Sequence, residues 1–274
     1  MKTTYLGSPK LPYAILIACL LMFGLNPLSA QQEESKTVYV TMQYMKVKPG
    51  NIDAYLELEN LWKKMHQARV DAGELLYWGL HQVVSPTGTN AEYNFTTVNL
   101  YEGEEALAAH YEGEMSEGML KLYTEEELEI MQKTTELRDL VKEEVYYRTL
   151  RVTDGKPGAN FIVTNYMQLQ GDASLADHTE LEEIWSKIHQ ARIDDGKMKA
   201  WSSWDMVLPM DSEMAHQSIT VDFYEDMAQW MAPFYQEYFA KVYPDMDLDK
   251  FAAKMEAVFK NHHVDILMRI DGTD

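Results

Sequence analysis

The stretch LENLWKKMHQARVDAG at Leu58–Gly73 recurs as LEEIWSKIHQARIDDG at Leu181–Gly196. The two stretches are identical at ten of sixteen positions and lie 123 residues apart. The same offset aligns TVNLYE at Thr97–Glu102 with TVDFYE at Thr220–Glu225. One constant offset across separated blocks indicates two copies of one domain, without large insertions between those blocks.

The first thirty residues are typical of a secretory signal peptide. Lys2 and Lys10 give the chain a positive start, and the run Leu11–Leu25 is almost entirely apolar. Small residues then precede a change to polar composition at Gln31, so we expect cleavage after Ala30 and a secreted or periplasmic protein. An uncleaved membrane anchor is the alternative, but the apolar run is short for a full span.

A lipoprotein anchored at Cys19 is a further alternative, because Leu16–Cys19 loosely resembles a lipidation box. Cys19 is the only cysteine of the chain. Cleavage after Ala30 therefore leaves a mature chain with no disulfide, no cysteine nucleophile and no thiolate metal site. No second apolar run is long enough to cross a bilayer, so we expect no stable membrane insertion after cleavage.

The chain is strongly acidic. Its net charge is −20, and loss of Lys2 and Lys10 with the signal peptide lowers the charge from −20 to −22. A surface of this sign repels phosphate backbones and anionic lipid head groups, so nucleic acid is not expected as a partner. The acidity is instead typical of a protein that must stay in solution after export.

The first copy reads as a strand, a helix, two strands, a broken helical region and a final strand. Asn51 can cap the first helix, Gly73 can end it, and Thr124–Glu127 has the spacing of a capping box. The expected strands are 37–47, 75–84, 93–101 and 145–152, and the expected helices are 51–72 and 124–142, with breaks at Gly113 and Gly118 between them.

The second copy repeats this order. Its expected strands are 161–168, 199–208, 215–224 and 264–270, its first helix is 174–196, and its second helical stretch is 226–263 with a break near Pro244. The turn formers of Asp154–Gly158 are typical of a linker. We therefore expect one repeat at residues 37–152, a linker at 153–159 and a second repeat at 160–270.

The order β-α-β-β-α-β is the ferredoxin-like arrangement, which places both helices on one face of an antiparallel sheet. The other face is an apolar surface that needs a cover, and a tandem copy supplies one. We predict an α+β fold of two tandem ferredoxin-like repeats packed sheet to sheet. In element order and duplication, residues 37–270 resemble the dimeric α+β barrel superfamily, here fused into one polypeptide that can remain a monomer.

Members of this superfamily include monooxygenases of the antibiotic-biosynthesis type, haem-degrading enzymes, haem proteins related to chlorite dismutase, and stress-responsive proteins. The resemblance implies a ligand pocket between the sheet and the helices of each repeat. It rests on the architecture of the chain, and an architecture so widely reused does not define an activity.

Three side chains with useful chemistry recur on the first helix of each copy and form one narrow stripe at the edge of its buried face. An indole can stack on a planar ligand, an imidazole can exchange a proton, and a guanidinium can hold an oxyanion. The alternative is a packing motif that both copies inherited. The candidate pocket residues are Trp62, His66 and Arg69, with Trp185, His189 and Arg192.

The remaining histidines form no metal-binding spacing, so neither a metal site nor a bound cofactor is expected. His110 and His178 read as surface residues of helices, and His262 and His263 are expected to end the last helix, near the negative end of its dipole. Phosphate-binding loops and nucleophile elbows are missing from the sequence.

The function that we expect is an exported protein that binds a small apolar or aromatic molecule in each repeat. If the protein is an enzyme, the nearest analogy is a cofactor-independent oxygenase or isomerase, with His66 and His189 as proton carriers. The alternatives are a non-enzymatic stress or structural protein of the envelope, and a haem-binding or haem-degrading relative of the superfamily.

Overall fold

A computed structural model of the chain describes residues 36–273 apart from 87, 89–90, 113–116, 157–158, 211–213 and 233–234. The predicted signal peptide, its cleavage site and Cys19 lie outside the described residues. None of the helices within this described part is long and apolar enough to span a membrane.

Each repeat contains four strands, with one long helix after its first strand. The elements of the first repeat are β1 (Val38–Val47), α2 (Ile52–Asp71), β2 (Tyr77–Ser85), β3 (Phe95–Glu102), α3 (Glu104–Glu112), α4 (Glu117–Leu120), α5 (Glu125–Gln132), α6 (Thr134–Leu137) and β4 (Arg138–Thr153). Those of the second are β5 (Phe161–Leu169), α7 (Leu175–Asp194), β6 (Ala200–Leu208), β7 (Ser218–Tyr224), α8 (Met227–Trp230), α9 (Tyr235–Val242), α10 (Leu248–Val258) and β8 (Phe259–Gly272).

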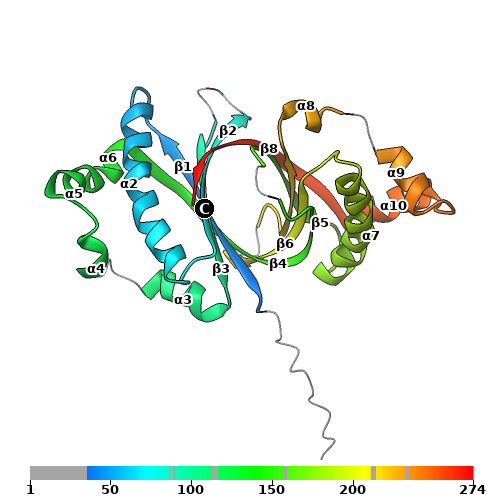
Figure 1. Cartoon of the computed structure of the whole chain (residues 1–274). Coiled ribbons are helices and arrows are strands. Elements are labelled where there is room, and N and C mark those ends of the chain that lie inside the picture. Colours follow the sequence, from blue (N-terminus) through cyan, green and yellow to red (C-terminus); the bar gives the residue numbers. More distant parts are fainter. Residues whose placement is uncertain are drawn as a thin grey trace, which may run out of the picture. The chain divides into compact units, whose positions relative to one another are not determined.

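The eight strands form a closed antiparallel barrel in the order β1-β3-β2-β8-β5-β7-β6-β4. Within each repeat the order is that of a ferredoxin-like sheet, and β2 pairs with β8 and β4 with β6 where the repeats meet. The fold is thus the predicted α+β fold of two ferredoxin-like halves in one dimeric α+β barrel. Figure 1 shows the ring of strands, with α2 and α7 on opposite outer sides.

Local sequence signals explain where the helices begin and end. Thr124 and Ser174 each form a complete capping box, with Glu127 and Asp177 respectively. Gly73 follows the end of α2 with a φ of 74°, in the region that only glycine adopts at low cost. The expectation for Asn51 was only partly right, because it stands at the N-cap of α2 but its side chain makes no capping hydrogen bond.

The structure corrects two expected boundaries. The helix expected to reach Lys142 ends at Leu137, and β4 begins at Arg138, seven residues before the expected strand. Likewise β8 begins at Phe259, so His262 and His263 lie on a strand and not at a helix end. Both strands are long because each pairs with two neighbours. The first part of β4 pairs with β1 and its second part with β6. The first part of β8 pairs with β5 and its second part with β2.

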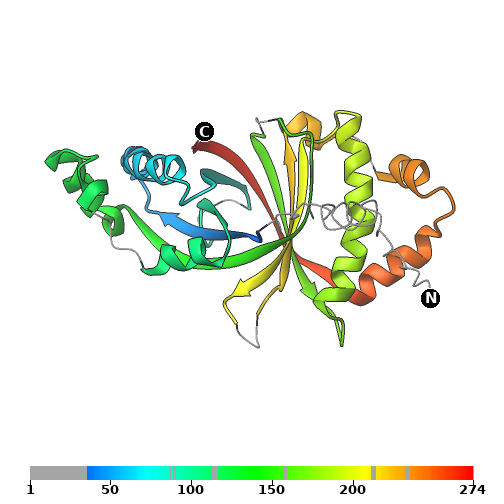
Figure 2. The same cartoon turned by 60° about the horizontal axis from the view of Figure 1, so that its bottom comes forward.

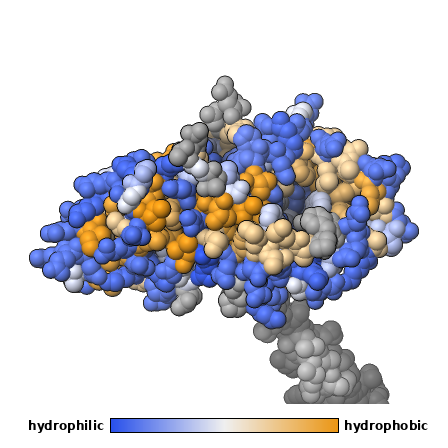
Figure 3. All heavy atoms as spheres, turned by 90° about the horizontal axis from the view of Figure 1, so that it is seen from above, coloured by the Kyte–Doolittle hydropathy of each residue, from blue (hydrophilic) through white to orange (hydrophobic). Residues whose placement is uncertain are grey.

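Side chains from both repeats fill the barrel, and separate apolar clusters lie between each sheet and its helices. The inner cluster includes Val40, Met42, Ile162, Ile219 and Leu267, which belong to β1, β5, β7 and β8. Figure 2 shows the resulting layers, in which helices cover the outside of the barrel on both sides. In the face seen in Figure 3, hydrophilic residues lie mainly toward the edges, and hydrophobic residues gather across the middle.

A buried polar network crosses the barrel and joins the two repeats. Glu144 accepts hydrogen bonds from the hydroxyls of Tyr44 and Tyr146, at 2.7 Å each. In the second repeat, Asp265 accepts from Tyr166 at 3.0 Å and from Tyr93 of the first repeat at 2.6 Å. The hydroxyls of Tyr44 and Tyr166 lie 3.0 Å apart, so the two halves of the network are linked. Such a network is favourable only when its buried groups are mutually paired.

Glu144 makes this network sensitive to acid. Burial acts to raise the pKa of its carboxyl, but the hydrogen bond with His216 and the charge of Lys142 outweigh burial and lower the pKa from 4.5 to about 2. A carboxyl with a lowered pKa stabilises the fold above its unfolded pKa, and that contribution is lost as the pH falls toward the folded pKa.

We therefore expect the free energy of unfolding of the native protein, relative to Glu144→Gln, to decrease by up to about 3 kcal/mol between pH 5 and pH 2. Urea denaturation at a series of pH values measures this difference. The matched control is Glu92→Gln, an exposed carboxylate near the same end of the barrel, which should show no comparable slope. An equal slope in both comparisons would contradict the role of Glu144.

Candidate functional site

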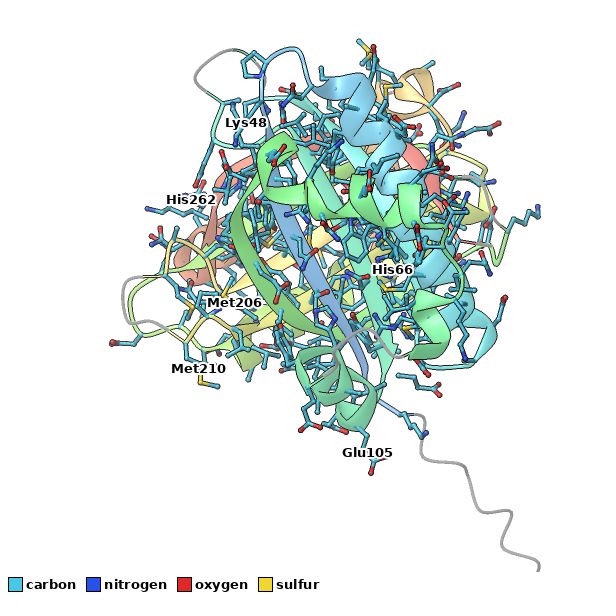
Figure 4. All side chains as sticks on the ribbon, turned by 90° about the vertical axis from the view of Figure 1, so that its left-hand side faces the viewer. Lys48, His66, Glu105, Met206, Met210 and His262 are labelled. Carbon is cyan, nitrogen blue, oxygen red and sulfur yellow. The ribbon has the colours of Figure 1, made fainter. Side chains whose placement is uncertain are left out.

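A cavity of about 600 Å³ lies between the sheet and the helices of the first repeat. Residues of α2, α3 and α4 line one side, and residues of all four strands line the other. The lining includes Gln43, Glu59, Trp62, Met65, His66, Arg69, Trp78, Thr97, His110, Met119 and Arg138. Figure 4 looks onto this helical side and places His66 among these elements, whereas the labelled His262 lies toward one end of the barrel.

The predicted first-repeat stripe thus lines the cavity as a unit. Trp62, His66 and Arg69 follow one another at intervals of four and three residues on α2, which places them on one face of the helix. The imidazole of His66 stacks on the indole of Trp78, with ring centroids 5.2 Å apart and an interplanar angle of 10°. The cavity therefore has flat aromatic surfaces contributed by a helix and by a strand.

His66 is neutral at physiological pH. Burial, together with the charges of Arg69 and His110, lowers the pKa of its imidazole from 6.5 to about 3. Its Nδ1 atom is buried and has no hydrogen-bond partner within the described part of the chain. A neutral imidazole whose Nδ1 has no partner can donate a hydrogen bond to a ligand or accept one from it. With so low a pKa, however, it is a weak base near pH 7.

Glu59 is a buried acid of this cavity that can exchange a proton near neutral pH. Burial raises the pKa of its carboxyl from 4.5 to about 7, although the charge of Arg138 and a hydrogen bond from Tyr55 act to lower it. Only 3% of the residue is exposed. Glu59 was missed as a candidate, yet it is one of the ten identical positions of the repeat and recurs as Glu182.

Two guanidinium groups border the same space. Arg69 lies 5.9 Å from the ring centre of Tyr101, and its Nε lies 3.7 Å from Glu74. The Nε of Arg138 and the indole nitrogen of Trp62 are buried without a partner among the described residues. Buried donors of this kind are rarely left unpaired in proteins, so they mark a place where a ligand or water supplies an acceptor. Arg138 was missed because its segment was expected to be helical.

The second repeat uses the same residues as core. His189 stacks between Trp185 and Trp201, with centroid distances of 5.7 and 5.0 Å. One guanidinium nitrogen of Arg192 lies 3.3 Å from Nδ1 of His189, and the other donates to the Tyr224 hydroxyl at 3.5 Å. His189 and Arg192 are only 4% and 2% exposed. The predicted residues therefore come together in both repeats, but only those of the first repeat border the cavity described above.

Aromatic residues of the last helices account for this difference. Phe239 of α9 and Phe251 of α10 contact the indole of Trp185, with ring centroids 5.2 and 6.1 Å apart. In the first repeat, α3 brings the small residues Ala106 and Ala109 to the cavity. Large side chains close the space in one copy, and small ones leave it open in the other.

The other histidines lie elsewhere. His178 was expected at the surface but is fully buried, with its Nε2 3.2 Å from Glu182, because it lies on the face of α7 that meets Phe259 and the barrel. His262 and His263 lie at one barrel end, where His263 stacks on Tyr166 at 3.8 Å. No group of three or more His, Cys, Asp or Glu side chains suited to a metal ion occurs in the described residues.

The comparisons with solved structures find the same fold at low sequence identity. A candidate monooxygenase from Lactobacillus acidophilus NCFM is 13% identical, with a TM-score of 0.53 over 87% of this chain and 96% of that one. A candidate monooxygenase from Fusobacterium nucleatum gives 9%, a TM-score of 0.56, and coverage of 88% and 95%. An anthrone oxidase-like protein gives 12%, a TM-score of 0.50, and coverage of 87% and 93%.

These matches support the resemblance to dimeric α+β barrel proteins at the level of the fold. No family model matches the sequence, and the curated proteins contain no match to it either.

The raised pKa of Glu59 predicts a stability change opposite in sign to that of Glu144. An acid whose folded pKa is raised stabilises the fold fully below its unfolded pKa, and this contribution is lost as the pH rises through the folded pKa. Relative to Glu59→Gln, the native protein should lose up to about 3 kcal/mol of unfolding free energy between pH 4.5 and pH 8. Urea denaturation across this range measures the difference.

The matched control is Glu57→Gln, which removes an exposed carboxylate from the solvent side of the same helix. Its comparison with the native protein should be nearly independent of pH. If the two variants showed the same pH dependence, Glu59 would not be the buried acid of this site.

Proposed function

We propose that this chain is an exported protein that binds a planar aromatic molecule bearing a polarised oxygen in the first-repeat cavity. The observation that carries the proposal is the combination of flat aromatic surfaces, two guanidinium groups and the proton-exchanging carboxyl of Glu59 around one space of about 600 Å³. A volume of this size is typical of sites for small organic molecules.

The binding roles follow from the side chains. Trp62 and the stacked pair of His66 and Trp78 offer aromatic faces against which a flat ring system can pack. Arg69 and Arg138 supply donors for a carbonyl or phenolate oxygen, and the unpaired Nε of Arg138 favours an acceptor at that position. An anionic or strongly polarised oxygen is therefore a better match for this site than an amine.

The chemistry that these residues support is proton abstraction next to a carbonyl. The Glu59 carboxylate takes a C–H proton of the ligand, and the bonding electron pair moves through the ring system onto the carbonyl oxygen. Arg69 and Arg138 stabilise the resulting oxyanion. Return of the proton from Glu59 to another ligand atom completes an isomerisation, and reaction of the carbanion with dioxygen, as co-substrate, is the first step of a cofactor-independent oxygenation.

A carboxyl with a pKa of about 7 suits this role better than the neutral imidazole of His66, because efficient proton transfer needs a pKa near the working pH. We propose one such site per chain, not one per repeat. His189 and Arg192 are buried in the core of the second repeat, so there they are assigned to packing.

Haem, which the resemblance implies for some members of the superfamily, fits this cavity poorly. Of the two histidines on its wall, His110 has its Nε2 4.0 Å from Glu143, and His66 lies flat against the indole of Trp78, which fixes the plane of its ring. Carboxylates of Glu59 and Glu74 also line the cavity and would repel the propionates of a porphyrin. We therefore derive no step through haem.

Anthrone is a suitable probe, because it is planar and carries an acidic methylene group conjugated to a carbonyl. We expect it to quench the tryptophan fluorescence of the native protein on binding, and its methylene protons to exchange with deuterated water faster in the presence of the protein. Trp62→Ala should weaken binding roughly 10-fold or more, because it removes a stacking surface. Glu59→Gln should retain binding but lose the accelerated exchange, which nuclear magnetic resonance of the probe measures.

The matched control is Trp185→Phe, a change to the equivalent tryptophan in the closed repeat, which should leave binding and exchange unchanged. Binding without accelerated exchange would assign the chain to the non-enzymatic alternative. Absence of binding by the native protein would overturn the proposal. An absorbance band typical of haem in protein isolated from its natural compartment would do so as well.

A further inference from the structure

The interior of the barrel holds a second cavity, of about 450 Å³, which is separate from the site described above. All eight strands contribute to its wall, which identifies it as the barrel lumen. The apolar part of the wall comes from alternate residues of the strands, whose side chains point inward. It includes Val40, Met42, Val98, Leu100, Ile162, Trp204, Ile219, Val221, Phe223 and Leu267.

Five cationic side chains surround this lumen. Arg148 lies over the indole of Trp204 at 5.6 Å, and Arg269 lies over the ring of Tyr77 at 5.7 Å. The others are Arg151, Lys156 and Lys199. Such a concentration of positive charge is unexpected in a chain with a net charge of −20. The positive potential at the lumen opening attracts anions.

Few acidic groups compensate these cations. Asp154 lies 3.4 Å from Lys199, and Asp271, which follows Arg269 by two residues, pairs instead with Lys63 at 2.6 Å. Arg148, Arg151, Lys156 and Arg269 form no ion pair with any described residue. The half-buried Arg148 is the most informative of them, because removing a guanidinium from water without a counter-charge is unfavourable.

The opposite end of the barrel has a different character. There the lumen meets the buried network of Tyr44, Tyr146 and Tyr166, whose hydroxyls pair with Glu144 and with each other. The apolar space is thus bounded by a polar network on one side and by cations on the other. A molecule that fits it has an apolar chain and one anionic head.

We infer that the barrel lumen binds a single-chain carboxylate amphiphile of the fatty-acid class. Its alkyl chain lies among the apolar residues of the lumen, and its carboxylate lies among Arg148, Arg151 and Arg269. A guanidinium pairs with a carboxylate through two parallel hydrogen bonds, which fixes the head group at the opening. This site is independent of the first-repeat cavity and of any reaction proposed there.

Isothermal titration calorimetry with octanoate, decanoate and dodecanoate tests the inference. Affinity should increase about fourfold for each added methylene group, the increment expected for burial in an apolar space. Decyltrimethylammonium has an alkyl chain one carbon longer than that of decanoate and a cationic head. It should still bind at least roughly tenfold more weakly than decanoate, because its charge is repelled at the opening.

Charge-reversal and obstructing variants identify the site. Arg151→Glu reverses an exposed charge at the opening and should weaken dodecanoate binding roughly three- to tenfold, whereas Lys121→Glu, the same charge change at an exposed position away from the lumen, should not. Val98→Phe places a larger side chain in the lumen and should abolish binding. If Val98→Phe lowers the melting temperature sharply, Ile219→Phe provides the same obstruction from the second repeat.

Equal affinities for the anionic and cationic amphiphiles would overturn the inference, as would binding that survives both obstructing variants. Binding that is lost in Trp62→Ala but kept in Val98→Phe would place the amphiphile in the first-repeat cavity, and would also overturn it. A failure of anthrone to bind would leave these outcomes unaffected, since the two cavities share no lining residue.

Discussion

The structure depends on the closure of two strand edges between the halves of one chain. A ferredoxin-like sheet ends at β2 on one side and at β4 on the other, and each edge carries a row of unpaired backbone groups. Here β8 covers the edge of β2 and β6 covers the edge of β4, so no sheet edge of the barrel stays open. Closure also encloses the inner faces of both sheets, which form the wall of the barrel lumen.

Duplication has left the same motif in two different surroundings. The same tryptophan, histidine and arginine stand on α2 and α7, yet Phe239 and Phe251 press on Trp185 in one half while small alanines border the stripe in the other. The motif is retained in both halves because they share an ancestor and a helix geometry. The neighbouring helices determine whether the motif borders a cavity.

The fold could be predicted from the sequence because its determinants are local or repeated. The offset of 123 residues reveals the duplication, and the capping boxes at Thr124 and Ser174 mark helix starts. The start of β4 could not be predicted in this way. Its segment Arg138–Glu144 consists mainly of good helix formers, and only pairing with β1, which is distant in sequence, makes it a strand.

The candidate site was predictable only in part. Helical spacing placed Trp62, His66 and Arg69 together, and the recurrence of Glu59 as Glu182 was a signal that went unused. Burial raises the pKa of Glu59 and lowers that of His66. This burial depends on elements that the constant offset between the repeats does not align. The difference between the open and the closed copy depends on α9 and α10.

The end of the chain belongs structurally to the first half. The amide of Thr273 donates to the carbonyl of Trp78, and its hydroxyl accepts from the amide of the same residue. While the polypeptide is being synthesised, β2 therefore has no partner on its outer edge until β8, the last strand of the second repeat, has been made. Closure of the barrel therefore waits for the second repeat, and until then the first half presents an open strand edge to neighbouring chains.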